Sequence, residues 1–344
     1  MGDAAIRVRG LTKRFGEVQA LRGIDLDVTA ATVYGLLGPN GAGKTTAVRI
    51  LTTIIKPDDG HAEVLGKDVC RQPQAVRERI GLAGQYAAVD ENLTGRENLR
   101  LIGRLTHVPR TSILDRAAEL LDRFGLSDAA DRPVGTYSGG MRRRLDLAAA
   151  LVHRPPVLFL DEPTTGLDIV SRTDLWQVIE ELVGDGTTVL LTTQYLEEAD
   201  RLADNLAVID RGMVIAHGTP SELKAQAGTT VINIRVTDHE QAVDVAERLA
   251  GAGIGLAYPT IHDHTVELAV DEGPSALMQV LRTFDAAGLT PAGLTVREPS
   301  LDDVFLNLTG HRTEATPDPG LADPAEPPAP ADDGTGVVER QEAT

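Results

Sequence analysis

A glycine-rich segment ending in lysine and threonine constrains the fold of this chain more than any other feature. It runs from Gly38 to Thr46 and matches the spacing G-x-x-x-x-G-K-[ST]. The preceding residues, 33–37, form the short apolar run of a buried strand, and the following residues to Leu51 have the apolar pattern of a helix. This order predicts a phosphate-binding loop inside an α/β domain.

Each residue type in this segment has a chemical role. Glycines let consecutive backbone N–H groups converge on phosphate oxygens, and the N-terminus of the next helix adds partial positive charge. We expect Lys44 to place its ammonium against the β- and γ-phosphates and Thr45 to bind Mg²⁺. The residues expected to hold the nucleotide are Gly38, Pro39, Asn40, Gly41, Ala42, Gly43, Lys44, Thr45 and Thr46.

A second feature suited to phosphate chemistry is an apolar run that ends in two carboxylates. Residues 157–160 are apolar, and Asp161 and Glu162 follow them directly. Acids at the carboxyl end of a buried strand, beside a phosphate-binding loop, supply what phosphoryl transfer needs. We expect Asp161 to hold Mg²⁺ and Glu162 to polarise the attacking water.

The composition divides the chain into three regions. Apolar runs alternate with helical patterns over residues 1–226, as in an α/β domain. Residues 229–310 predict the ferredoxin-like order βαββαβ and a last short helix, with strands at 231–236, 254–258, 265–270 and 294–297 and helices at 240–249, 274–287 and 301–308. Proline, alanine and acidic residues dominate 311–344, which predicts a disordered acidic tail.

Charge and hydropathy narrow the classes of function. The chain has 33 Lys and Arg against 51 Asp and Glu, a net charge of −18, which argues against a nucleic-acid partner. No apolar run approaches the roughly 20 residues of a transmembrane helix, so any membrane role must come from a partner. The one cysteine, Cys70, fits a reducing compartment.

The turn Ser138-Gly139-Gly140, ahead of a helical pattern, identifies a family. With it, the chain resembles the ATP-binding cassette (ABC) family, whose other motifs occur in the expected order. The resemblance implies a P-loop NTPase core of the RecA-like type with a helical subdomain at about residues 87–155. It also implies that Phe15 stacks on adenine and that Gln85 contacts metal and nucleotide. Asp168 is implied to cross a subunit interface.

In this family the Ser-Gly-Gly turn faces the γ-phosphate held by a second subunit. The resemblance therefore implies a head-to-tail dimer of this chain, with ATP and Mg²⁺ between Lys44 of one copy and Ser138, Gly139 and Gly140 of the other. The following arginines, 142–144, are interpreted as a solvated helix face. The metal ligands implied are Thr45, Gln85 and Asp161, and the catalytic residues are Glu162, Lys44, Gln194 and Gln85.

One residue departs from the family pattern. Gln194 stands where the family has a histidine, and an amide can donate and accept hydrogen bonds but cannot become a cation. This exchange leaves open slow hydrolysis or a mechanism dominated by Glu162, and a further alternative is a nucleotide-binding scaffold with negligible turnover.

Longer motifs point to a narrower branch. The stretches at residues 137–148, 192–200 and 298–305 resemble the daunorubicin-resistance type of drug-exporter ATPase. This implies efflux of a drug or other hydrophobic compound through a separate membrane permease, which would contact residues 87–99, and a peripheral place on the cytoplasmic face of the membrane. The alternative is a non-transport ATP-dependent switch or resistance factor acting on a soluble target.

Overall fold

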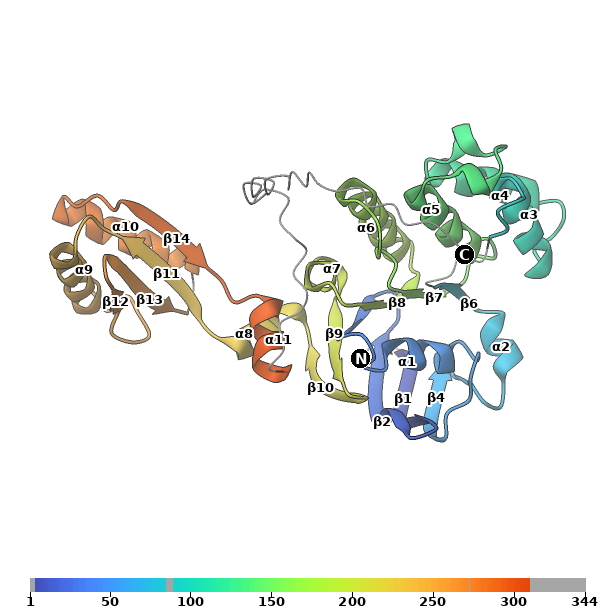
Figure 1. The fold of residues 1–344 in the computed structure, drawn as a ribbon, viewed down its shortest axis with the longest axis horizontal. Coiled ribbons are helices and arrows are strands. Elements are labelled where there is room, and N and C mark those ends of the chain that lie inside the picture. Colours follow the sequence, from blue (N-terminus) through green and yellow to red (C-terminus); the bar gives the residue numbers. More distant parts are fainter. Residues whose placement is uncertain (1–3, 85–88, 272, 310–344) are drawn as a thin grey trace, which may run out of the picture. The chain divides into compact units, whose positions relative to one another are not determined.

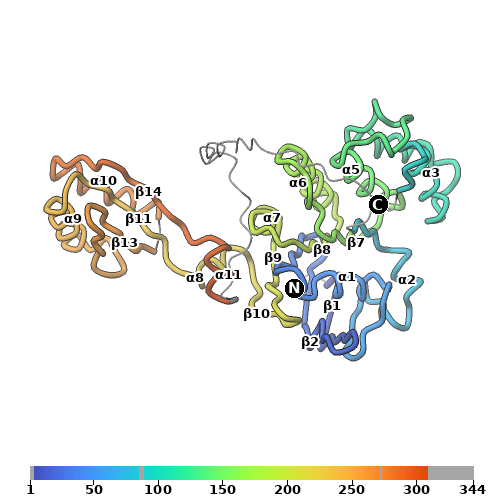
Figure 2. The backbone as a smooth tube through the Cα atoms, viewed as in Figure 1, coloured from blue at the N-terminus to red at the C-terminus, as the bar shows by residue number. Residues whose placement is uncertain are grey.

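The computed structural model describes residues 4–84, 89–271 and 273–309, and Figures 1 and 2 colour their elements along the chain. Within them, the strands form three sheets. The largest has the order β10-β9-β3-β8-β7-β6, with all neighbours parallel except the edge pair β10–β9. Its strands are β3 Val33–Leu37, β6 Ile80–Ala83, β7 Val157–Asp161, β8 Thr188–Thr193, β9 Asn205–Asp210 and β10 Met213–Gly218.

The central strands of this sheet are buried on both faces. Val157 and Phe159 of β7 point into one core, while Leu158 and Leu160 point into another. Apolar residues on both faces are typical of a parallel sheet covered on each side. The predicted strand at 33–37 is confirmed as β3.

One face of the large sheet is covered by helix α1 (Lys44–Leu51) and an antiparallel sheet of order β2-β1-β4-β5. These strands are β1 Ala4–Phe15, β2 Val18–Thr29, β4 Asp59–Val64 and β5 Lys67–Asp68, and the short helix α2 spans Pro73–Arg77. Ile6, Leu21 and Ala62 pack with Ala47 and Ile50 of α1 in one apolar core. This core fixes α1 directly behind the phosphate-binding loop.

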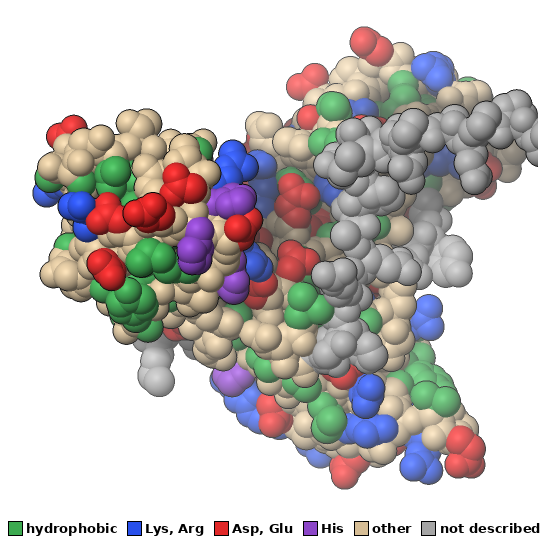
Figure 3. Space-filling model, turned by 60° about the vertical axis from the view of Figure 1, so that its left-hand side comes forward, with side chains coloured by type: hydrophobic (Ala, Val, Ile, Leu, Met, Phe, Trp, Pro, Cys, Tyr) green, Lys and Arg blue, Asp and Glu red, His purple; other side chains and the backbone are tan. Residues whose placement is uncertain are grey.

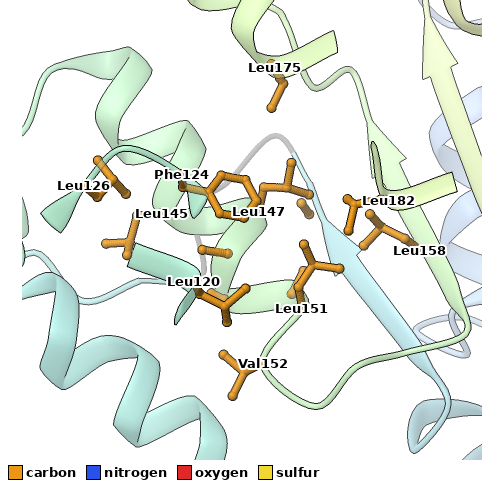
Figure 4. Close-up of a cluster of buried hydrophobic side chains, with 14 of the residues drawn as sticks. Leu120, Phe124, Leu126, Leu145, Leu147, Leu151, Val152, Leu158, Leu175 and Leu182 are labelled. Carbon is orange, nitrogen blue, oxygen red and sulfur yellow. The ribbon is translucent and has the colours of Figure 1, made fainter. Parts of the chain in front are cut away.

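The other face packs against a group of helices. They are α3 Gly95–Leu105, α4 Ile113–Arg123, α5 Gly139–Ala150 and α6 Ile169–Gly184, with 3₁₀ turns η1 Ser127–Ala129 and η2 Val134–Thr136. Figure 4 shows Leu120, Phe124 and Leu145 gathered with Leu158 of the sheet. The start of α3 carries a capping box, because Thr94 accepts from the amide of Glu97 and Glu97 accepts from the amide of Thr94.

Residues beyond Thr229 form the third sheet, in the order β12-β13-β11-β14 with all neighbours antiparallel. Helices α9 His239–Gly251 and α10 Gly273–Ala287 pack on it (Figure 1), and its strands are β11 Thr230–Arg235, β12 Thr260–His262, β13 Thr265–Val270 and β14 Gly293–Arg297. The predicted order βαββαβ is present here, and this sheet order is the ferredoxin-like one.

The strand predicted at 254–258 is wrong, since the second strand of this sheet is β12, which begins at Thr260. Ile254 is buried in the core, but Leu256 and Tyr258 are exposed. Gly253 has φ +66° and turns the chain after α9, and Pro259 has no amide to donate to a ladder. Apolar residues at alternate positions are therefore not enough to form a strand here.

The last described helix, α11 Leu301–Thr309, packs on two helices that precede the third sheet in the chain, α7 Leu196–Leu202 and α8 Pro220–Ala227. Val304 and Phe305 share a buried cluster with Leu196, Ala199 and Leu223. Because α7 begins two residues after Gln194, this cluster borders the segment that carries one of the expected catalytic residues.

The charge of the surface and the length of the helices bear on whether this chain binds nucleic acid or crosses a membrane. On the face drawn in Figure 3, Lys and Arg side chains are mixed with Asp and Glu rather than gathered into a basic patch. Among the described residues, no helix has both the length and the apolar character needed to cross a bilayer. The predicted tail at 311–344 lies outside the described residues.

We predict that two leucines of α4 differ sharply in their effect on stability. Leu120 is 1% exposed and Leu114 is 54% exposed. Replacing Leu120 with Ala should lower the free energy of unfolding by about 2–5 kcal/mol, because it leaves a cavity in the core. Leu114→Ala should lower it by about 0.5 kcal/mol or less. Denaturant unfolding of both variants measures the difference, and equal losses would contradict the packing described for α4.

Candidate functional site

The phosphate-binding loop follows β3 and leads into α1, and close backbone contacts fix its path. A Cβ on Gly38 would lie 2.2 Å from the carbonyl oxygen of Ile209 in β9. Gly43 has φ +113°, and a Cβ there would lie 2.6 Å from the carbonyl oxygen of Ala20 in β2. These two positions require glycine for space and, at Gly43, also for conformation.

Helix α1 begins without a side chain capping its first amides, which leaves N–H donors at its N-terminus for a phosphate. Lys44, the first residue of the helix, is buried, with 4% of its surface exposed. Its Nζ donates to the carbonyl oxygens of Gly38 at 2.6 Å and Pro39 at 3.2 Å. Burial lowers the pKa of the Lys44 ammonium, while the nearby carboxylate of Glu162 acts in the opposite direction.

The two acids after β7 lie against this loop, as the sequence predicts. Glu162 Oε1 is 3.6 Å from Lys44 Nζ, and both side chains are buried. The hydroxyl of Thr45 donates to Asp161 Oδ1 at 3.2 Å. Hydroxyl and carboxylate oxygens are ligands that suit Mg²⁺, so this pair fits the metal expected there.

Thr192, near the end of β8, is a site residue that the sequence did not reveal. Its hydroxyl donates to Asp161 Oδ1 at 2.6 Å and accepts from the backbone N–H of Glu162 at 3.1 Å. Glu162 has φ +50°, an uncommon value outside glycine, and its N–H donates to both the hydroxyl and the carbonyl oxygen of Thr192, which helps to hold this conformation. The sequence offers only a weak signal for this role, which is a threonine one residue before the end of a strand.

Phe15 lies at the end of β1 and is 49% exposed, with Lys13 Nζ 5.5 Å from the centre of its ring. The hairpin from Phe15 continues into β2 to Ala20, which contacts Gly43 of the loop. An exposed ring on a hairpin that reaches the loop is placed suitably for the adenine stacking expected of it.

The Ser-Gly-Gly turn begins α5. Ser138 is exposed and caps the helix by accepting from the N–H of Met141 at 3.2 Å. The preceding Tyr137 is buried, and its hydroxyl donates to the carbonyl oxygen of Ala129 at 2.6 Å. The exposed turn therefore stands on a fixed base, with its glycine amides open to a ligand.

Asp168 caps the neighbouring helix, α6. Its carboxylate accepts from the N–H of Ser171 at 2.8 Å and from the Ser171 hydroxyl at 2.9 Å, and these bonds hold the pKa of Asp168 below its usual value. A Cβ on Gly140 would lie 2.8 Å from Ser171 Oγ, so Asp168 and the Ser-Gly-Gly turn border the same residue. Within the described part of the chain, neither Ser138 nor Asp168 hydrogen-bonds to the phosphate-binding loop.

Of the two glutamines predicted at the site, the structure describes Gln194 but not Gln85. Gln194 is half-buried and directly follows β8, two residues beyond Thr192. The backbone N–H of Gly38 contacts the carbonyl oxygen of Thr193 at 3.4 Å, which ties the phosphate-binding loop to this strand end. Gln85 lies outside the described residues.

The interpretation of residues 142–144 as a solvated helix face fits Arg142, whose side chain is partly exposed, but is wrong for Arg143. Arg142 pairs with Glu91 at 2.8 Å, and Arg144 donates to the carbonyl oxygen of Phe124 at 3.2 Å. Arg143 is the most enclosed, and it donates to the carbonyl oxygen of Pro163 at 2.7 Å. The turn of α5 aims this side chain toward the end of β7, and a run of three identical residues does not reveal this direction.

Comparisons with known proteins agree with this geometry. The family model described as ABC transporter matches residues 21–165, and that described as ATP-binding protein DrrA1-3-like, C-terminal domain, matches residues 218–309. The chain is 54% identical over 316 residues to the daunorubicin resistance ATP-binding protein DrrA2 of Streptomyces coeruleorubidus, covering 92% of this chain and 98% of the relative.

More distant proteins agree as well. A Nod factor export ATP-binding protein I of Ralstonia nicotianae is 38% identical, over 89% of this chain and 94% of its own. The solved structure of cbiO1 from Clostridium perfringens, part of an ABC transporter complex, superposes with a TM-score of 0.60 at 27% identity, covering 73% of this chain and 98% of that one. The resemblance found in the motifs and the predicted fold class are thereby confirmed. The chain belongs to the ATP-binding proteins of the ABC transporter family, in the branch that carries the DrrA-type C-terminal domain.

Proposed function

We propose that this chain hydrolyses ATP to power export of a drug or other hydrophobic compound through a separate integral membrane permease, at the cytoplasmic face of the membrane. The observation that carries the proposal is the meeting of buried Lys44, Asp161 and Glu162 with half-buried Thr45 in one cluster. The names of the relatives, which refer to daunorubicin resistance and Nod factor export, support export as the purpose of the hydrolysis.

The side chains of this cluster have different roles in the proposed reaction. Thr45 and Asp161 would hold Mg²⁺, and a bound Mg²⁺ neutralises charge on the β- and γ-phosphate oxygens. Lys44 now hydrogen-bonds to carbonyl oxygens of its own loop and would exchange them for phosphate oxygens. Glu162 would then lose the lysine as its closest cation, and its Oε1 would orient and polarise a water while Oε2 accepts from the hydroxyl of Thr165.

We further propose that two copies bind head to tail. The exposed turn at Ser138 has open amide donors at a helix N-terminus, where an anion is stabilised. Because Ser138 makes no hydrogen bond to the phosphate-binding loop within the described residues, a second copy would supply the phosphate that this turn binds. Asp168, beside the same turn, would lie at the interface between the copies.

A groove between α2 and the helices α3 and α4 is the proposed docking place for the permease. Its volume is about 910 Å³, and it contains apolar, acidic and basic side chains. Leu105, at the end of α3, lines it and is 68% exposed. A cytoplasmic helix of the permease with an apolar anchor would fit such a surface. The contact expected at residues 87–99 would then extend to the groove.

We predict that Glu162→Gln lowers the turnover number for ATP by about 10²- to 10⁴-fold, because an amide cannot accept a proton from the attacking water. ATP binding should persist, since the phosphate-binding loop is unchanged. Steady-state hydrolysis and equilibrium binding of a fluorescent ATP analogue measure the two effects. Glu247→Gln, on the exposed side of α9, is the matched control and should leave turnover unchanged. Equal rates for Glu162→Gln and the unaltered chain would contradict the proposal.

We also predict that Leu105→Glu uncouples hydrolysis from transport, because a carboxylate would be desolvated when the permease covers the groove. In cells that express the chain with its permease, export should fall about tenfold or more. Hydrolysis by the purified chain should not change. Leu256→Glu, at another exposed leucine, serves as control. Unchanged export in Leu105→Glu would place the permease elsewhere.

A further inference from the structure

Arg143 makes contacts that the proposed reaction does not yet use. It lies in the first turns of α5, five residues after Ser138, and its side chain is 13% exposed. Nε donates to the carbonyl oxygen of Pro163 at 2.7 Å, and Nη2 donates to that of Asp161 at 3.3 Å. Nη1 donates to the carbonyl oxygen of Gly84, at the end of β6. One guanidinium thus binds three backbone carbonyls from two segments.

The positions of these carbonyls matter because they flank proposed catalytic residues. Asp161 and Pro163 stand on either side of Glu162, and Gly84 directly precedes Gln85. A guanidinium is planar and holds its donors in a fixed fork, so it sets the spacing between the segments that it binds. A lysine ammonium, a compact group on a flexible stem, would not fix both segments in this way.

The charge of Arg143 is compensated close by. Asp146, one turn further along α5, places Oδ2 3.5 Å from Nη1, and its side chain is almost fully buried. The arginine is therefore held from its own helix as well as by the carbonyls. This arrangement makes it a rigid link between α5 and the loop that carries Glu162.

The geometry points to Arg143 as a positioning residue for hydrolysis, which holds the backbone of Glu162 in place from α5, the helix that the Ser-Gly-Gly turn begins. This inference rests on the proposed function, in which Glu162 polarises the attacking water. Since Ser138 begins the same helix, a phosphate bound at the Ser138 turn by the partner copy acts on the element that carries Arg143. The helix thereby connects the state of one nucleotide site to the position of Glu162 in the other.

The test compares Arg143→Met with Arg144→Met in the full-length chain. Arg144 is the matched control, because it occupies the same helix but donates to the carbonyl oxygen of Phe124, away from the acids. Arg143→Met should lower the turnover number about 30-fold or more and change KM for ATP about threefold or less, as expected when Glu162 is misplaced and the phosphate-binding loop is intact. Arg144→Met should change neither value appreciably.

A double variant separates positioning from general support of the fold. In the Glu162→Gln background, Arg143→Met should lower the residual rate by about twofold or less, because residues that act as a unit are not additive. If Arg143→Met lowered turnover by the same factor in both backgrounds, the inference would be overturned. An equally large decrease in turnover in Arg144→Met would also overturn it. If Arg143→Met does not fold, as judged by circular dichroism, Arg143→Lys takes its place with the same expected results.

The outcomes also distinguish this inference from the proposed function. A large loss in Glu162→Gln, together with normal turnover in Arg143→Met, would overturn the role of Arg143 alone. Normal turnover in Glu162→Gln would overturn the role of Glu162, and the inference with it.

Discussion

The hydroxyl of Thr192 joins the two carboxyl-bearing residues at the edge of the central sheet, and the site depends on this contact. It donates to Asp161, accepts from the backbone of Glu162, and so sets both acids against Thr45 and Lys44. Because these groups are buried, their electrostatic interactions are stronger than in water, and small displacements change them appreciably. The parallel strands β3, β7 and β8, buried on both faces, give the cluster a rigid support.

Much of the fold follows from local patterns in the sequence. The glycine-rich loop, its strand and its helix are neighbours along the chain, so their pattern predicts their structure directly. The order of elements after Thr229 is also local and was predicted. The strand at 254–258 failed because the apolar alternation there reflects one buried residue, Ile254, beside a glycine turn and a proline. Apolar residues at alternate positions do not by themselves show which of these side chains are buried in a core.

The residues that the sequence did not reveal act through contacts between distant segments. Thr192 is an ordinary strand residue until β8 lies beside β7 and brings it to Asp161. Arg143 looks like its two neighbours, and the helical turn of α5 alone decides that it points at Gly84 and Pro163. Such roles depend on sheet order and helix rotation, which motifs do not encode. Conversely, Ser138 was found by its motif, although its proposed partner lies in another copy of the chain.

The central claim is that Lys44 of one copy and Ser138 of the other hold the same terminal phosphate, and mixing two inactive variants tests it directly. Lys44→Ala and Ser138→Phe are each expected to be inactive alone. In a mixed dimer both defects fall in one site, which leaves the second site intact, so ATP hydrolysis should reappear on mixing at about a quarter of the normal rate. A mixture no more active than its separate components would contradict the account.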